Sequence, residues 1–384
     1  MSEPTEGLGS ARRFAPAGAV FAAFGLALFG YFVWKAGPDK IWEQIAALGF
    51  GFLAVLLVSA ARPALRTLAW TRCFDSEHTL RFRDAIRAYL IGDALGNVMP
   101  LGIVVSEPAK AALVRDRVPL TAAVSALAVE NLFYMLSVAL FIFAGTAAML
   151  ASFPLPKHLR IAAFSTLGVV LVVLTVAFVA VRRKWRPLSR VLAWAGGSNW
   201  GRRVVGGRTA KIGAIEERVY GFYERHGARF LPILALEACF HLAGVAEVFV
   251  TLYFMLDTVP PPAQLALSAF VLESVNRVIN VVFKFVPMRV GVDEAGTGMF
   301  TNVLRLGTTA GVTLAIVRKA RVIVWTGVGV GLLVRRGRAG ARRRARRGRR
   351  PSLKTPSRRA RAPDSEIRPP RAARNFTPRD RRRS

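Results

Sequence analysis

The chain has 384 residues, of which 53% are hydrophobic, and its formal net charge is +32. Its mean hydropathy is +0.36, and several apolar runs exceed the roughly 20 residues needed to cross a bilayer. This composition excludes a soluble globular protein and predicts an all-α, polytopic membrane protein. The two cysteines, Cys73 and Cys239, have no His or Cys neighbours at metal-ligand spacing, so we expect neither a disulfide framework nor a bound metal.

Hydropathy predicts about six full transmembrane helices, and the segments between them are polar or rich in proline. The predicted spans are 14–34, 48–70, 118–150, 160–181, 230–256 and 308–334. The run Pro38-Asp39-Lys40 is expected to form the turn after the first span. Arg62 and Arg66 lie four residues apart near the end of the second span. We expect their charged ends to snorkel to the membrane interface.

One short stretch occurs twice, and it organises the rest of the chain. Residues 97–110 and 284–298 each contain a proline followed seven positions later by a glutamate, and the two copies are 187 positions apart. Each copy interrupts an apolar region with proline, glycine and charge, and each precedes a long apolar helix. Broken apolar segments at matching positions of two halves indicate a transport site. We therefore predict two re-entrant helical hairpins, with arms at 85–97, 106–116, 264–285 and 293–306.

The positive charge is concentrated in two segments that lie outside the predicted spans. Residues 335–384 hold 21 Lys/Arg against three acids, and residues 182–229 hold 12 against three. Both segments are expected on the cytoplasmic side, because basic segments next to spans stay inside. The two copies are then threaded in opposite directions, as an inverted repeat. The predicted domains are a cytoplasmic lead 1–13, a transmembrane domain 14–334 with repeats at about 48–150 and 230–334, a basic loop 182–229 and a disordered Arg-rich tail 335–384.

Ionisable residues inside the spans are the candidate site, because a charge at mid-bilayer costs about 2.5–3.5 kcal/mol and must face protein or water. Glu107 and Glu294 match between the two copies. Each could cap the half-helix that follows, or line a polar cavity, and the two roles can coexist. Arg318, Lys319 and Arg321 are three cations within four positions and outnumber the local acids. This favours contact with an anionic headgroup, and pairing with acids inside the protein is the alternative.

Two further pairs are expected from helical spacing. Glu273 and Arg277 are four residues apart, which predicts a local helix pair. Glu237 and His241 share a face one turn apart. His241 could relay protons, but a hydrogen-bonded structural histidine is the favoured reading.

Motifs of catalysis are missing from the sequence. It contains no phosphate-binding loop, dinucleotide fingerprint, HExxH motif or GxSxG elbow. We therefore expect no enzyme activity and no cofactor. The basic tail is expected to bind anionic lipid of the inner leaflet, rather than a specific nucleic acid.

The first copy resembles the transmembrane region of the lysylphosphatidylglycerol synthase family, also called the flippase-like domain. The residues that carry the resemblance are Asn97-x-x-Pro100, Glu107-Pro108-Ala109-Lys110 and Glu130-Asn131, with Pro287 to Glu294 in the second copy and Arg62-x-x-x-Arg66 before Trp70. It covers about residues 14–335. The first tip is two residues longer than the family pattern and lacks its arginine, and Asn131 stands where an arginine is usual. The resemblance implies the membrane module without the soluble aminoacyl-transfer domain.

Together these features predict a lipid translocase of the bacterial cytoplasmic membrane, with both termini in the cytoplasm and a polar or anionic phospholipid or lipid-linked headgroup as substrate. The alternatives are a membrane anchor or regulatory subunit of a lipid or polysaccharide synthesis system, and a secondary transporter of small solutes or ions. The oligomeric state stays open. The predicted substrate and translocation residues are Asn97, Pro100, Glu107, Lys110, Glu130, Pro287, Arg289, Asp293, Glu294 and Arg318, with Arg62, Arg66, Glu237, His241 and Arg321 as further candidates.

Overall fold

The protein is described from a computed structural model. The structure describes residues 37–98, 102–183, 224–283 and 291–348, together with Tyr31, Trp34, Glu217, Gly221, Phe222 and Arg289. Most of the predicted first span, both proline tips and most of the basic loop and tail lie outside these residues. The chain divides into two units, 1–336 and 337–384. The helices below belong to the first unit, except for the part of α14 that follows Arg336.

The part of the chain that the structure describes is helical, as the composition predicted. Its helices are α2 (Pro38–Leu48), α3 (Gly51–Arg72), α4 (Phe82–Val98), α5 (Gly102–Leu113), α6 (Leu120–Ser152), α7 (Lys157–Arg182), the 3-10 turn η1 (Gly227–Arg229), α11 (Phe230–Met255), α12 (Pro262–Val282), α13 (Val292–Val303) and α14 (Thr308–Gly348). Five of these segments are long and apolar enough to cross a membrane: Gly51–Arg72, Leu120–Ser152, Lys157–Ala180, Gly227–Met255 and Pro262–Val282. The chain is therefore a multi-pass helical membrane protein.

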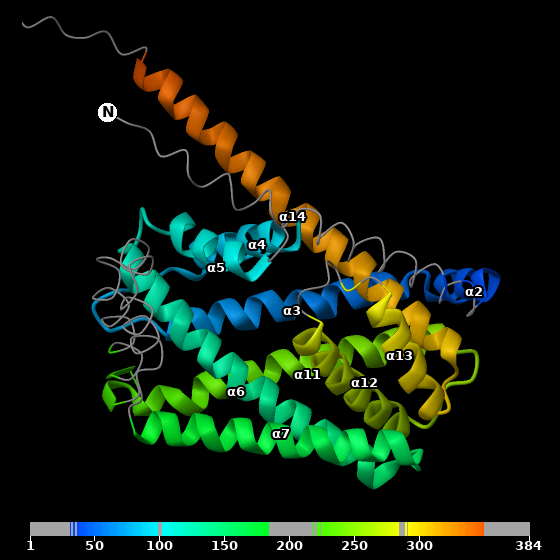
Figure 1. The fold of residues 1–384 in the computed structure, drawn as a ribbon. Helices are drawn as coiled ribbons and strands as arrows, with labels where there is room; N and C mark the ends of the chain where they lie inside the picture. Colours follow the sequence, from blue (N-terminus) through cyan, green and yellow to red (C-terminus); the bar gives the residue numbers. More distant parts are fainter. Residues whose placement is uncertain are drawn as a thin grey trace, which may run out of the picture. The chain divides into compact units, whose positions relative to one another are not determined.

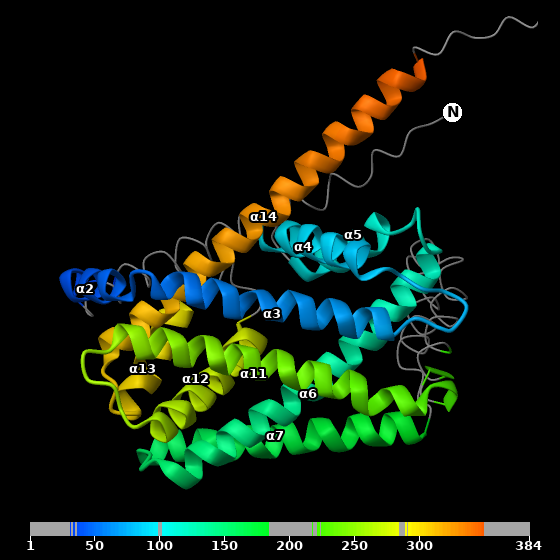
Figure 2. The same ribbon diagram turned by 180° about the vertical axis from the view of Figure 1, so that it is seen from behind.

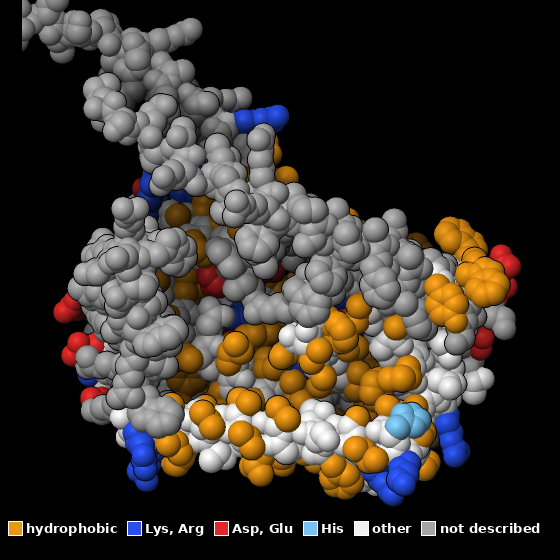
Figure 3. Space-filling model, viewed as in Figure 1, with side chains coloured by type: hydrophobic (Ala, Val, Ile, Leu, Met, Phe, Trp, Pro, Cys, Tyr) orange, Lys and Arg blue, Asp and Glu red, His pale blue; other side chains and the backbone are white. Residues whose placement is uncertain are grey.

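Helix α7 shows most directly which surface meets lipid. The most apolar 18 residues of α7 have a mean hydropathy of 2.5, yet only 6% of these residues are buried inside the protein. Its large side chains, such as Phe164, Leu171 and Phe178, are exposed. Figure 3 shows apolar side chains along the lower part of this face, where α7 lies. Such a surface is stable in lipid, which is as apolar as these side chains.

The helices that follow the two copies of the repeated stretch run in opposite directions. In Figure 1, α6 runs from left to right and α14 from right to left, and the turned view in Figure 2 agrees. The α4–α5 pair lies beside the half of α3 that ends at Arg72, whereas α12 packs on α11 and α6 and carries α13. This arrangement is what an inverted repeat requires.

Close packing in the first hairpin depends on glycine. A Cβ atom on Gly92 would lie 2.5 Å from Cγ of Lys110, and one on Gly96 would lie 2.9 Å from Cβ of Ser106. In the second hairpin, a Cβ on Gly296 would lie 2.5 Å from Cδ1 of Ile279. Both pairs of arms thus approach at a distance that a side chain on these glycines would prevent.

Three features of the sequence prediction need correction. Pro38 does not form a loop but begins helix α2. Proline is tolerated at this position, because the first backbone N–H groups of a helix have no partner within the helix. The second hairpin is not simply re-entrant: its arm α12 has 21 residues and is long enough to cross a bilayer, whereas its other arm, α13, has only 12. Helix α14 continues to Gly348 instead of ending at the predicted start of the disordered tail, because alanine and arginine favour helix and the next proline is Pro351.

Candidate functional site

Ionisable side chains buried among the helices form three clusters, which contain most of the predicted site residues. The first-hairpin cluster contains Arg66, Glu107, Lys110, Glu130 and Asn131. The central cluster contains Arg62, Glu247, Glu273, Arg277, Arg318 and Arg321. The second-hairpin cluster contains Arg289, Asp293, Glu294 and Lys319. Each cluster joins residues that are far apart in the sequence.

The first-hairpin cluster links α3, α5 and α6. Arg66 donates from Nε to Oε1 of Glu130 over 2.6 Å. Lys110 Nζ donates to Oε1 of Glu107 over 2.9 Å, and Asn131 Nδ2 donates to Oε2 of Glu107 over 3.3 Å. Asn131 also accepts from Arg66 over 3.4 Å. The amide of Asn131 therefore connects the two ion pairs of this cluster.

The central cluster lies between α3, α11, α12 and α14. Arg62 pairs with Oε2 of Glu247 at 3.2 Å and with Oε1 of Glu273 at 3.7 Å. Arg277 and Arg318 pair with the two oxygens of Glu273 at 2.5 and 3.1 Å. Arg321 pairs with Oε2 of Glu247 at 2.8 Å.

Two arginines of the central cluster also contact an aromatic ring. The guanidinium carbons of Arg62 and Arg277 lie 4.7 and 5.1 Å from the ring centroid of Phe240, within cation–π range. The predicted helix pair of Glu273 with Arg277 is confirmed. The predicted snorkelling of Arg62 and Arg66 is wrong, because acids from other helices hold both guanidinium groups inside the bundle.

The second-hairpin cluster joins the start of α13 to α14. Glu294 accepts a hydrogen bond from the backbone N–H of Gly291 over 2.7 Å, which caps α13, and it also pairs with Lys319. Asp293 accepts from Nε of Arg289 over 3.3 Å and lies 3.9 Å from Lys319. Arg289 has a φ of 49°, an uncommon left-handed conformation for a residue with a side chain. Glu294 thus caps the N-terminus of α13 and is itself buried.

Other predicted residues lie elsewhere. Asn97 is exposed, and its Nδ2 donates to Thr326 of α14 over 3.0 Å. His241 is buried, with Nε2 3.1 Å from the hydroxyl of Ser137, and it stacks on Phe141, as a structural histidine would. Glu237 is fully buried within electrostatic range of Arg66 and Glu130. Pro100 and Pro287 lie outside the described residues.

The predicted list of site residues lacks three charged residues at the centre of this arrangement, although Glu273 and Arg277 were predicted to pair. Glu247, Glu273 and Arg277 are not among the predicted site residues, although each is a charge in the middle of an apolar helix. Their position in apolar helices could have identified them as site candidates, because a charge inside the membrane needs a partner inside the protein. For Lys319 the structure shows the alternative that the sequence analysis left open, pairing with acids inside the protein, because it pairs with both acids of the second-hairpin cluster.

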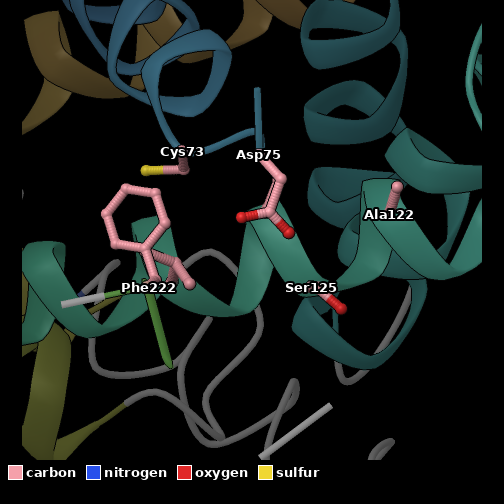
Figure 4. Close-up of a pocket in the computed structure, with 7 residues that line it drawn as sticks. Cys73, Asp75, Ala122, Ser125 and Phe222 are labelled. Carbon is pink, nitrogen blue, oxygen red and sulfur yellow. The ribbon is translucent and has the colours of Figure 1, made fainter. Parts of the chain in front are cut away.

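A small surface pocket lies away from these clusters. It is lined by residues at the end of α3, on α6 and at Phe222, and Figure 4 shows the side chains of Cys73, Asp75 and Ser125 around it. It contains no residue of the three clusters. In Figure 3, acidic and basic atoms are visible instead in the recessed part of the face above α7. The clusters, not this pocket, are the candidate functional site.

Chemically, the three clusters can recognise charge, and no nucleophile–base pair was found among them. Within the described residues, no group of three or more His, Cys, Asp or Glu side chains could hold a metal ion. Arginine side chains offer several hydrogen-bond donors and can pair with more than one acid, as Arg62 does with Glu247 and Glu273.

Comparison with known proteins agrees with the residues noted in the sequence. The family model described as "Lysylphosphatidylglycerol synthase TM region" matches residues 17–331. No curated protein and no solved structure matches the chain. The match includes every residue of the three clusters.

Proposed function

The chain belongs to the lysylphosphatidylglycerol synthase transmembrane-region family, and from this premise we propose that it moves a polar or anionic lipid headgroup between the two leaflets of a bacterial cytoplasmic membrane. It acts as a flippase-like translocator and not as an enzyme. The match to a lipid-related membrane family supports the class of substrate. The arrangement of buried charge supports the activity.

One observation carries the proposal: the charged clusters run through the interior of a membrane bundle. Each charged side chain in such a place costs about 2.5–3.5 kcal/mol. Ion pairs reduce this cost, but hydrophobic residues of similar size are often equally stable or better. An extended set of buried ionic groups on α3, α6, α11, α12 and α14 is therefore better explained by a polar ligand that crosses the bundle than by stability.

Of the two matching glutamates, the one in the first hairpin is the more accessible. The side chain of Glu107 is 26% exposed, whereas that of Glu294 is fully buried. We assign Glu107 to the wall of a polar cavity, where its pairs with Lys110 and Asn131 can open to admit a headgroup. We assign Glu294 to holding α13 against α14.

The orientation follows from charge. The basic loop 182–229 and the tail 335–384 stay in the cytoplasm, where each basic residue near the anionic surface contributes about 1 kcal/mol of attraction to lipid. The first hairpin then opens to the cytoplasmic side and the second to the outer side. A headgroup entering at one hairpin meets the central cluster before it reaches the other.

The test is lipid movement in vesicles that contain the purified full chain. Fluorescent phosphatidylglycerol, labelled on an acyl chain, is distributed in both leaflets, and the fraction accessible to an impermeant quencher is followed. We expect the quenchable fraction to exceed the half found in empty vesicles and to rise to nearly all of the label. Glu107→Gln should slow this movement at least tenfold.

The matched control is Glu77→Gln, because Glu77 is an exposed glutamate in the loop between α3 and α4. This variant should move lipid as the unaltered protein does. Both variants must elute as the same single species in detergent. Equal quenching in protein-containing and empty vesicles would contradict translocation, and would favour an anchor or regulatory subunit.

A further inference from the structure

The central cluster differs from its neighbours in its charge balance. Four guanidinium groups, from Arg62, Arg277, Arg318 and Arg321, face only two carboxylates, from Glu247 and Glu273. Within the described residues, the ion pairs of this cluster thus leave two positive charges without an acid of their own. The excess lies deep in the bundle, since these arginine side chains are only 6–15% exposed.

The other two clusters carry no such excess. In the second-hairpin cluster, Arg289 and Lys319 face two acids, Asp293 and Glu294. In the first-hairpin cluster, Arg66 and Lys110 face Glu107 and Glu130. Asp93 also lies 3.8 Å from Lys110, and buried Glu237 adds a further carboxyl group nearby. The surplus of positive charge is therefore a local property of the central cluster.

Hydrogen-bond donors of the same arginines also lack partners. Among the described residues, the buried Nε atoms of Arg277 and Arg321 and the buried Nη1 of Arg318 make no hydrogen bond. The available acceptors are already in use: Glu273 accepts from Arg277 and Arg318, and also from Asn276 over 3.4 Å. Buried donors without acceptors are costly, so three of them around one carboxylate pair call for a further acceptor.

An oxyanion with several oxygens satisfies both requirements. Guanidinium groups match the spacing of phosphate oxygens and bind them through paired hydrogen bonds. A group with two negative charges would balance the cluster. A phosphate diester carries one, and a phosphomonoester or diphosphate carries about two near neutral pH.

Resting on the proposed function, we propose that the central cluster is the phosphate-binding site of the translocation path and selects headgroups by negative charge. Its preferred ligand class is a lipid phosphomonoester or diphosphate, followed by a phosphate diester such as phosphatidylglycerol. An aminoacylated headgroup is disfavoured, because its ammonium groups would add positive charge to a site that already has an excess. The substrate preference is thus opposite to that expected of a carrier for lysylated lipid.

Binding is measured apart from movement, so that the two proposals can fail separately. The purified full chain in neutral detergent is titrated with dihexanoyl phosphatidic acid, dihexanoyl phosphatidylglycerol, a short-chain lysylphosphatidylglycerol and dihexanoyl phosphatidylcholine. We expect phosphatidic acid to bind at least tenfold more tightly than phosphatidylglycerol. Lysylated and zwitterionic lipids should bind weakest. Equal affinity for all four lipids would overturn the proposal.

Arg318→Gln is the informative variant, because Glu273 keeps Arg62 and Arg277 as partners when Arg318 is lost. It should bind phosphatidic acid at least tenfold more weakly, and Arg318→Lys should recover part of the loss. Arg160→Gln is the matched control, because Arg160 is exposed on α7. Unchanged affinity in Arg318→Gln, with the variant folded by its elution and thermal midpoint, would overturn the assignment.

Inorganic phosphate identifies the source of the ligand. Displacement of phosphatidic acid only at phosphate concentrations at least a hundredfold above the lipid supports a lipid site. Equal affinities would keep the anion site but contradict its assignment to lipid. Selective binding without lipid movement would leave the cluster assigned and refute translocation, whereas movement that ignores headgroup charge would refute the selectivity alone.

Discussion

Glu107 and Glu294 occupy matching positions of the repeat, but the structure holds them differently. Glu294 caps α13 through the backbone N–H of Gly291 and pairs with Lys319 of α14, and none of its side chain is exposed. Glu107 bonds to Lys110 within its own helix and to Asn131 of α6, and it stays partly exposed. The matching glutamates therefore differ: Glu294 stabilises the contact of α13 with α14, whereas Glu107 stays accessible from outside the bundle.

The first prediction follows from this difference. Glu294→Gln should lower the free energy of unfolding by about 3 kcal/mol, the lower end of the cost of removing one partner from a buried pair, because Asp293 still lies 3.9 Å from Lys319. Thermal unfolding in detergent measures the change. Combining Glu294→Gln with Lys319→Met should restore part of the midpoint, and Glu107→Gln should change it far less. A midpoint for Glu294→Gln within one degree of the unaltered protein would contradict the prediction.

A second prediction concerns the contact between α13 and α14. A Cβ atom on Gly311 would lie 2.5 Å from the carbonyl oxygen of Thr297 and 2.6 Å from Cα of Gly298. Since both are backbone atoms, the helices must move apart, and Gly311→Ala should cost about 1–3 kcal/mol. Gly327 lies on the same helix with nothing within 4 Å of an added Cβ. Gly327→Ala should therefore be neutral or slightly stabilising in the same thermal assay. Equal effects of the two substitutions would show that α13 does not pack on Gly311.

A third prediction uses the two cysteines as probes. Cys73 is buried at the end of α3, just beyond the predicted membrane span, and burial raises the pKa of its thiol well above the usual value. Because the thiolate is the reactive form and its pKa is raised, the thiol should stay protonated and unreactive even at pH 9. In a Cys239→Ser variant, a maleimide should label the folded protein slowly and the unfolded protein quickly, as measured by mass. Rapid labelling of the folded variant at pH 9 would contradict the burial of Cys73.

The fourth prediction tests how the chain is threaded. Lys157 is the first residue of α7, directly after the turn that follows α6, and Asp257 lies in the turn between α11 and α12. Two crossings separate these turns, so both should lie on one side, and Asp116, before α6, should lie on the other. In a cysteine-free background, Lys157→Cys and Asp257→Cys should react with an impermeant maleimide added to intact cells, and Asp116→Cys only after the membrane is opened. Labelling of all three in intact cells would contradict the threading.

Much of the helical framework could be predicted from the sequence, because crossing a bilayer requires a local property. A run of apolar side chains of sufficient length predicts a span wherever it lies, and α3, α6, α7 and α11 agree with the sequence to within a few residues. The pair of Glu273 and Arg277 was equally predictable, since one turn of helix brings them together. The prediction of a turn at Pro38 was wrong because a proline is common both in turns and at the start of a helix.

The sequence by itself determined that this is a helical membrane protein with charges inside its spans, and it predicted an internal repeat. Only the tertiary structure decided which charges meet. Arg62 and Glu247 are 185 positions apart, and their contact depends on how α3 and α11 cross. The sequence pattern of a single helix does not determine the angle at which it crosses another helix. The central cluster, with more arginines than acids, is therefore a product of packing among four helices, each of which must bury its charged residues inside the bundle because lipid cannot solvate them.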